Sequence, residues 1–160
     1  MSVNVRVYPP ALIPSRALHD LFGAVRMVSE SLDDILRRAE KRGAGALYDS
    51  DFSGSMGIAD WWYHYACLLD LPLIRAIDDP GLVASGADLD RLEAEVDRLE
   101  ACWAGLDLSA EPPSGRLIQN PDGSFREESV PFAENLRETA ATLQEAIRVA
   151  RDHGGVLIAG

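Results

Sequence analysis

The sequence has few lysines and histidines, and these shortages already limit its function. Lys41 is the single lysine among 15 basic residues, and 26 acidic residues bring the formal net charge to −11. Nucleic acids and anionic membranes bind proteins through basic patches, so this charge disfavours both as partners. The preference for arginine over lysine, together with many alanines and glycines, is typical of a GC-rich bacterial genome.

Long apolar runs and cysteine pairs at regular spacing are missing as well. No stretch approaches the ~18 apolar residues of a membrane-spanning helix. The first residues, Met-Ser-Val-Asn-Val-Arg, do not resemble a signal peptide. Cys67 and Cys102 are the only cysteines, so we expect free thiols and a cytoplasmic location. The length of 160 residues fits one domain.

Known catalytic signatures are absent too. The chain has no GxSxG, no Walker loop, no GxGxxG after a strand and no HExxH. Its three histidines are few for acid–base chemistry. We therefore predict no catalytic residue and no cofactor, and enzymatic activity is less favoured than binding.

The hydropathy pattern predicts an α+β fold of about four helices on a small, mostly antiparallel sheet. Alternating residues predict a strand over 3–8, and an apolar run predicts a buried strand over 156–159 beside it. Asn-Pro-Asp-Gly between 116–119 and 124–128 predicts a hairpin of the same sheet. Apolar residues three and four apart predict the helices. These span about 16–42, 58–70, 89–104 with Asp88 as cap, and 129–152 with Ser129 as cap.

The charge is unevenly distributed along the chain. Residues 60–113 hold twelve acidic residues and three arginines, which accounts for nine of the eleven excess negative charges. On the helix over 89–104, the inward apolar stripe leaves one outer row of carboxylates, the acidic ridge. The ridge consists of Asp90, Glu93, Asp97 and Glu100. Such a row favours either solubility or attraction of a cationic protein.

The helix over 58–70 carries a cluster of aromatic residues. Trp61 and Tyr65 share one face and Trp62 lies on a neighbouring face, so one packing surface cannot bury all of the rings. Exposed Trp and Tyr are typical anchors of protein interfaces, whereas a central helix would bury them on two sides. His64 and Cys67 follow on the same helix, where they indicate either a ligand site or a surface histidine above a buried thiol.

Residues 49–60 resemble the calcium loop of the EF-hand family. Asp49 occupies position one, Asp51 position three, Ser53 position five and Asp60 position twelve, with a glycine at position six. The resemblance covers twelve residues and implies an oxygen-ligated calcium site. Position twelve is Asp where the family has Glu, and the alternative is a polar surface loop, 49–57, before a helix.

These features favour a non-enzymatic protein–protein interaction module, such as an inhibitor or immunity protein. Its partner would be a basic protein, for example a toxin, bound through the acidic ridge and the cluster of Trp61, Trp62 and Tyr65. Two alternatives stay open. One is a small enzyme or ligand binder with a pocket at the aromatic cluster, and the other is a calcium-binding protein using Asp49, Asp51, Ser53 and Asp60. Self-association is open in each case.

Overall fold

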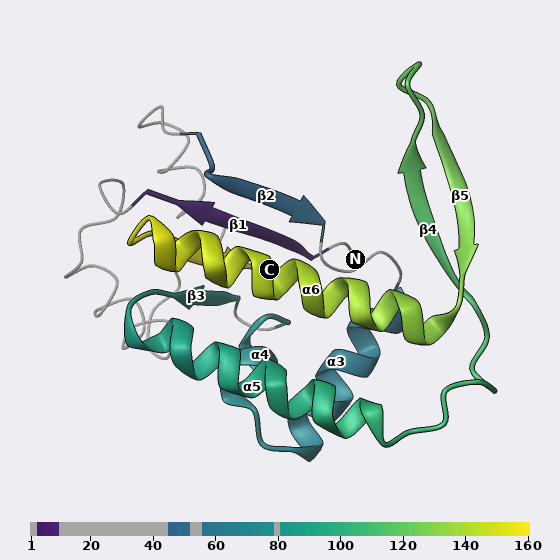
Figure 1. Cartoon of the computed structure of the whole chain (residues 1–160), viewed down its shortest axis with the longest axis horizontal. Coiled ribbons are helices and arrows are strands. Elements are labelled where there is room, and N and C mark those ends of the chain that lie inside the picture. Colours follow the sequence, from purple (N-terminus) through teal and green to yellow (C-terminus); the bar gives the residue numbers. More distant parts are fainter. Residues whose placement is uncertain (1–2, 10–44, 52–55, 79–80) are drawn as a thin grey trace.

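The computed structural model describes residues 3–9, 45–51, 56–78 and 81–160 (Figure 1). It has helices packed against antiparallel strands, which confirms the α+β class. The helices described are α3 (Met56–Leu68), α4 (Pro72–Ala76), α5 (Ala87–Ala104) and α6 (Phe132–Asp152). The strands described are β1 (Asn4–Tyr8), β2 (Tyr48–Asp51), β3 (Leu82–Ala84), β4 (Ser114–Gln119), β5 (Phe125–Val130) and β6 (Val156–Ala159). The helix predicted over 16–42 lies outside the described residues.

The main sheet is antiparallel, with the strand order β2-β1-β6-β3. Val3, Val5 and Val7 are buried while Asn4 and Arg6 are partly exposed, as the alternation predicted. Tyr8, which the alternation places on the outer face, is buried as well. β6 lies between β1 and β3, and all four of its residues are buried. The predicted position of the 156–159 strand beside the first strand is therefore confirmed.

The hairpin forms at the predicted place but as a sheet of its own, β4-β5, rather than as part of the main sheet. In its register Arg116 lies opposite Glu128, and Leu117 opposite Glu127. Each face of the hairpin therefore contains a charged residue. Without a wholly apolar face, the hairpin has little to bury against the core, which accounts for its separation from the main sheet.

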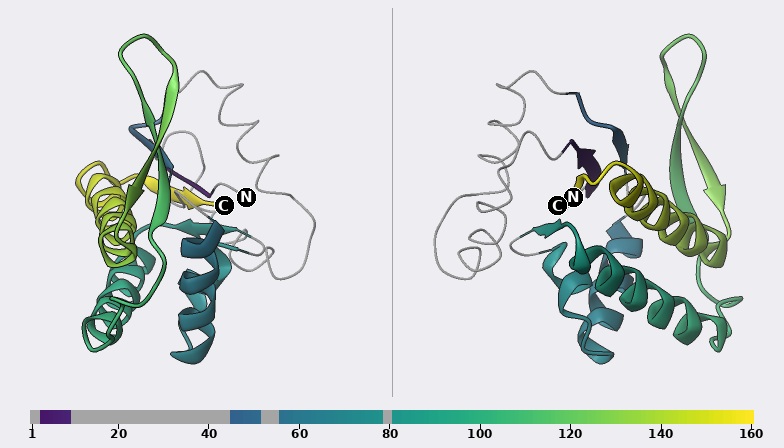
Figure 2. Two further views of the ribbon diagram at one scale, coloured as in Figure 1. Left: turned by 90° about the vertical axis from the view of Figure 1, so that its right-hand side faces the viewer. Right: turned by 60° about the vertical axis from the view of Figure 1, so that its left-hand side comes forward.

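Helices cover one face of the main sheet. α6 lies along β1 and β6, and α5 runs antiparallel to α6 on the same side (Figures 1 and 2). The predicted apolar stripes of both helices are buried and form the centre of the core. They consist of Leu89, Leu92, Val96, Leu99 and Trp103 in α5, and of Phe132, Leu136, Leu143 and Ile147 in α6. None of the described helices combines the length and apolar character needed to cross a membrane.

Both predicted helix caps are wrong by two residues. α5 begins directly after Gly86, whose φ of 54° is readily adopted only by glycine, so Asp88 already lies inside the helix. Ser129 lies in β5 opposite Gly115, and α6 begins after Pro131. Strand pairing therefore holds Ser129 in an extended conformation, and proline fixes the start of the helix.

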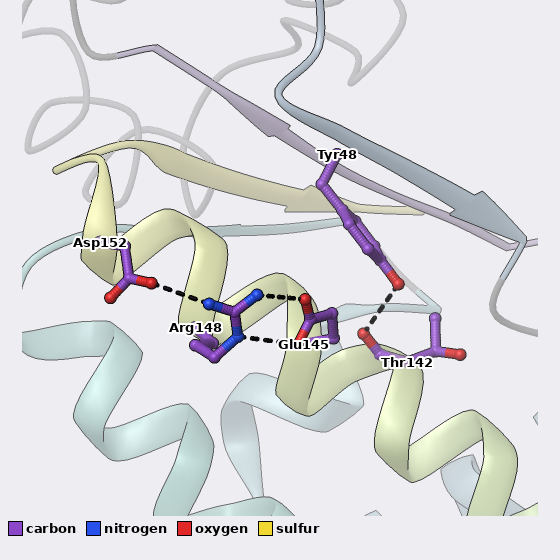
Figure 3. A network of polar contacts seen from close by, with 5 residues as sticks. All are labelled: Tyr48, Thr142, Glu145, Arg148 and Asp152. Atoms are coloured by element: carbon purple, nitrogen blue, oxygen red, sulfur yellow. Dashed lines mark hydrogen bonds and ion pairs between the residues drawn. The ribbon is translucent and has the colours of Figure 1, made fainter.

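The sequence does not predict β2, because Tyr-Asp-Ser-Asp is largely polar and its last three residues belong to the polar loop expected over 49–57. Its pairing with β1 is supported by Arg6, whose Nε donates to Oδ1 of Asp49 over 3.1 Å. The Tyr48 hydroxyl donates to the Thr142 carbonyl of α6 over 3.4 Å (Figure 3). Long-range contacts thus place a polar edge strand where local sequence favours a loop.

A tight reversal connects α6 to β6. The Gly155 N–H donates to the Ala150 carbonyl over 2.7 Å, and Gly154 has a φ of 57°, the geometry of a Schellman helix end. Gly155 also lies directly against β1, because a Cβ added there would be 2.7 Å from the Tyr8 carbonyl oxygen. The helix can end beside the sheet only because this position lacks a side chain.

We predict that Gly155→Ala lowers the free energy of unfolding by about 1–3 kcal/mol, since the methyl group would push backbone against backbone. Urea denaturation followed by circular dichroism measures this change. Gly105→Ala is the matched control, because the nearest atom to its added Cβ is 3.5 Å away. The explanation is wrong if the two substitutions have equal effects.

Candidate functional site

The acidic ridge lies on α5 where the spacing placed it, but three of its four carboxylates have partners within the protein. Nη2 of Arg151, on α6, lies 2.9 Å from Oδ1 of Asp90 and 2.8 Å from Oε2 of Glu93. These contacts raise the pKa of Arg151, chiefly through its hydrogen bond to Glu93. Glu100 accepts a hydrogen bond from the Gln144 amide over 2.6 Å. Asp97 is exposed and has no partner among the described residues.

The three aromatic residues proposed as interface anchors divide between core and surface. Trp62 is 3% exposed, so its ring is not available to a partner. Its Nε1 donates to Oγ1 of Thr139 over 3.1 Å. Trp61 and Tyr65 are half-buried and stack with ring centroids 5.3 Å apart. Trp61 also meets Phe132 of α6 at 4.9 Å. Only Trp61 and Tyr65 offer ring surface on this side of α3.

His64 and Cys67 lie on the outer side of α3, and both are exposed. The His64 ring meets Tyr65 edge-on, with centroids 5.3 Å apart. The Cys67 thiol instead forms a hydrogen bond with Tyr63, which is the main cause of the raised pKa of that tyrosine. Cys67 and Cys102 are both free thiols, as predicted, although Cys67 is not buried.

The residues of the calcium-loop resemblance are spread over two elements. Asp49 pairs with Arg6 in the sheet, Asp51 is the last residue of β2, and Asp60 is exposed on α3. Ser53 lies outside the described residues. Within the described ranges, no three His, Cys, Asp or Glu side chains gather where they could hold a metal ion.

The β4-β5 hairpin is a surface that the sequence predicted as structure but not as a site. It projects from the start of α6, away from the other described elements (Figures 1 and 2). Its base is fixed by Ser114, whose Oγ accepts a hydrogen bond from Nδ2 of Asn135 over 2.7 Å. Phe125, near the tip, is 66% exposed, an unusual position for a large apolar side chain.

The turn of this hairpin is ordered by its own side chains. The Asn120 N–H donates to the Ser124 carbonyl over 2.7 Å, and the Ser124 N–H donates to Oδ1 of Asp122 over 2.9 Å. Hydrogen bonds from the Ser124 hydroxyl and N–H lower the pKa of Asp122. The hairpin therefore reaches solvent as a defined two-stranded arm.

The outer face of α6 next to the hairpin base carries a shallow, open hollow of about 440 Å³. It is lined by Glu134, Arg137, Glu138 and Ala141. These residues lie three and four apart and share one side of the helix. The hollow and the hairpin are continuous along the chain, because β5 leads directly into α6.

Comparisons with known proteins give no assignment, because no family model, no curated protein and no solved structure matches the chain.

Glu95 is a buried acidic residue of α5 that stabilises the fold instead of adding charge to the surface. Glu95 is 8% exposed, and its carboxylate accepts hydrogen bonds from the backbone N–H groups of Leu73 and Ile74, with Oε2 at 3.0 Å from each nitrogen. It thereby holds the start of α4 against α5. The signal was present in the sequence, because Glu95 is three residues from Leu92 and four from Leu99 within the apolar stripe.

We predict that Glu95→Ala lowers the free energy of unfolding by about 2–4 kcal/mol, because two buried N–H groups lose a charged acceptor. Glu95→Gln keeps one acceptor oxygen and should lose about half as much. Urea denaturation measures both variants against Asp97→Ala, an exposed neighbour whose removal should change stability by less than about 0.5 kcal/mol. A loss for Glu95→Ala as small as for Asp97→Ala would contradict the assigned role.

Proposed function

We propose that this protein is a non-enzymatic protein–protein interaction module that binds a cationic protein partner. An inhibitor or immunity protein that masks a basic toxin in the bacterial cytoplasm fits this description. The observation that carries the proposal is the different use of the two signs of charge. Most of the described arginines contact acceptors of the protein itself, whereas the described carboxylates outnumber the arginines by eleven.

The charge of the described part supports this proposal. The described residues contain twenty acidic residues and nine arginines, so they carry the whole net charge of −11. Seven of these arginines contact acceptors of the protein itself. They are Arg6, Arg75, Arg91, Arg98, Arg137, Arg148 and Arg151. The local field is therefore negative over most of this surface, which speeds association with a cationic protein.

Two arginines of α6, Arg148 and Arg151, each contact two carboxylates of the protein. Arg148 lies between Glu145 and Asp152 on the outer side of the helix, and Nη1 is 2.9 Å from Oδ2 of Asp152 (Figure 3). Arg151 makes the matching contacts toward the acidic ridge. Each arginine faces two carboxylates, so every such group retains a net negative charge.

Affinity capture from cells of the source organism tests the proposal. We expect the immobilised protein to retain one dominant partner of basic isoelectric point, identified by mass spectrometry. Between 50 and 500 mM NaCl its association rate should fall by about tenfold or more, because salt screens exposed charges. A neutral or acidic partner, or a rate insensitive to salt, would overturn the proposal.

Variants that remove one positive charge from α6 test the same proposal through the association rate. Arg151→Gln and Arg148→Gln each release two carboxylates, and we expect each to raise the low-salt association rate by about two- to tenfold. Ala110→Ser, at an exposed position and without a change of charge, should leave the rate unchanged. If the partner docks on the acidic ridge, Arg151→Gln has the larger effect of the two.

A second candidate function is the binding of a small ligand at the aromatic cluster, and Trp103 favours it. Trp103 packs edge-on against Trp62 and Tyr65 at 5.1 and 6.2 Å. Its Nε1 is buried and has no hydrogen-bond partner among the described residues, whereas buried indole N–H groups normally have one.

A ligand that brought an acceptor oxygen to Trp103 would shift the tryptophan emission. We expect such a shift for at least one compound in a fluorescence screen of small carboxylic acids and amides. Trp103→Phe should abolish the shift, whereas Trp61→Phe should leave part of it. A screen without any saturable shift would contradict this second function.

A further inference from the structure

We propose that the open edge of β5 is the docking site, and that it pairs with an extended, arginine- or lysine-rich segment of the partner. This inference rests on the proposed function and specifies the site and the chemistry of the segment that occupies it.

The β4-β5 sheet has two strands, so each of its strands has one edge without a neighbour among the described elements. The bond from Asn120 N–H to the Ser124 carbonyl marks these two residues as a hydrogen-bonded pair. Hydrogen-bonded and non-hydrogen-bonded pairs alternate along an antiparallel ladder. Phe125, Glu127 and Ser129 are then non-hydrogen-bonded positions, and their N–H and C=O groups point away from β4. Three successive outward positions suffice to pair with an added strand.

Charge distinguishes the β5 edge from the β4 edge. β4 contains one charged residue, Arg116, whereas β5 contains Glu127 and Glu128 beside Arg126. β5 also leads into the hollow on α6, whose charged lining residues are Glu134, Arg137 and Glu138. An extended segment along β5 would therefore pass four carboxylates and two arginines, an excess of two negative charges, between the tip of the hairpin and the first turns of α6. A cationic segment complements this path, and an acidic one is repelled.

Phe125 gives the same edge an apolar contact. Its ring is 66% exposed near the tip, where an aliphatic or aromatic side chain of an added strand could cover it. A second copy of this chain is the weaker occupant, because two hairpins would bring Glu127 and Glu128 of each copy together. Like charges across a strand pair are destabilising.

The test uses a defined probe, an acetylated and amidated peptide of four Arg-Val repeats, added to ¹⁵N-labelled protein. We expect the backbone amides of Phe125, Glu127 and Ser129 to exchange more slowly with solvent when the peptide is present. The amides of Arg126 and Glu128 point into the hairpin ladder and should change little. A peptide of Glu-Val repeats is the charge control and should have no effect.

Two proline variants separate the edges. Glu127→Pro removes an outward N–H of β5, and Leu117→Pro removes the N–H of its cross-strand partner on β4. We expect Glu127→Pro to weaken peptide binding about tenfold, the loss typical of one backbone hydrogen bond and a charge. Leu117→Pro should bind the peptide as the wild type does. Glu127→Gln should lose only the part of the peptide affinity that depends on charge. Retained protection of the Arg126 and Glu128 amides shows that the hairpin is still folded in each variant.

The inference is overturned if the Arg-Val peptide protects none of the three amides, or if protection falls on β4 instead. Equal protection by the Glu-Val peptide contradicts the charge argument. Protection that rises with protein concentration in the absence of peptide identifies a second copy as the occupant. If affinity capture yields a basic partner that leaves the three amides unprotected, the proposed function stands and this docking site fails.

Discussion

The structure depends on the burial of β6 between β1 and β3. Val156–Ala159 is apolar throughout, and a strand of this kind is stable only where both of its faces are covered and both of its edges are paired. The register Val5 to Ala159 and Val7 to Leu157 joins the two ends of the described chain in one sheet. α6 must end beside β1 for this pairing to form, which is why Gly155 lies against the Tyr8 carbonyl. The helical layer is positioned by the same reversal, because α5 packs on α6.

The contacts of charged residues within the fold are the second feature that organises the structure. Arginines of α6 contact carboxylates on two sides, and Glu95 enters the core to hold the start of α4. The contacts of Arg151 and Glu95 join different helices, and those of Arg148 lie within α6, so carboxylates alone do not mark a binding surface. The docking site that we propose lies at β5 and the adjacent side of α6, away from the contacts between α5 and α6.

The local sequence predicted those elements that are determined by a few neighbouring residues. The periodic stripes of α5 and α6, the alternation in β1 and the Asn-Pro-Asp-Gly turn each follow from a few neighbouring residues, and all of them form. β2 could not be predicted in this way, because its four residues are polar and its extended state comes from pairing with β1. The pairing of Asp90 and Glu93 with Arg151 joins helices that are distant in sequence. Trp62 and Trp61 are adjacent, and only the tertiary packing of α3 decides which ring enters the core.

The central place of β6 also has a consequence for how the chain folds. β6 follows its partners β1 and β3 in the chain, and the β1–β6 register joins residues separated by almost the whole length of the sequence. Contacts of this range cost loop-closure entropy before they stabilise the chain, and they are associated with slow folding. During synthesis, β1 and β3 each keep an unpaired edge until β6 has been synthesised. The β4-β5 hairpin, by contrast, closes from local contacts alone and can form early, independently of the sheet.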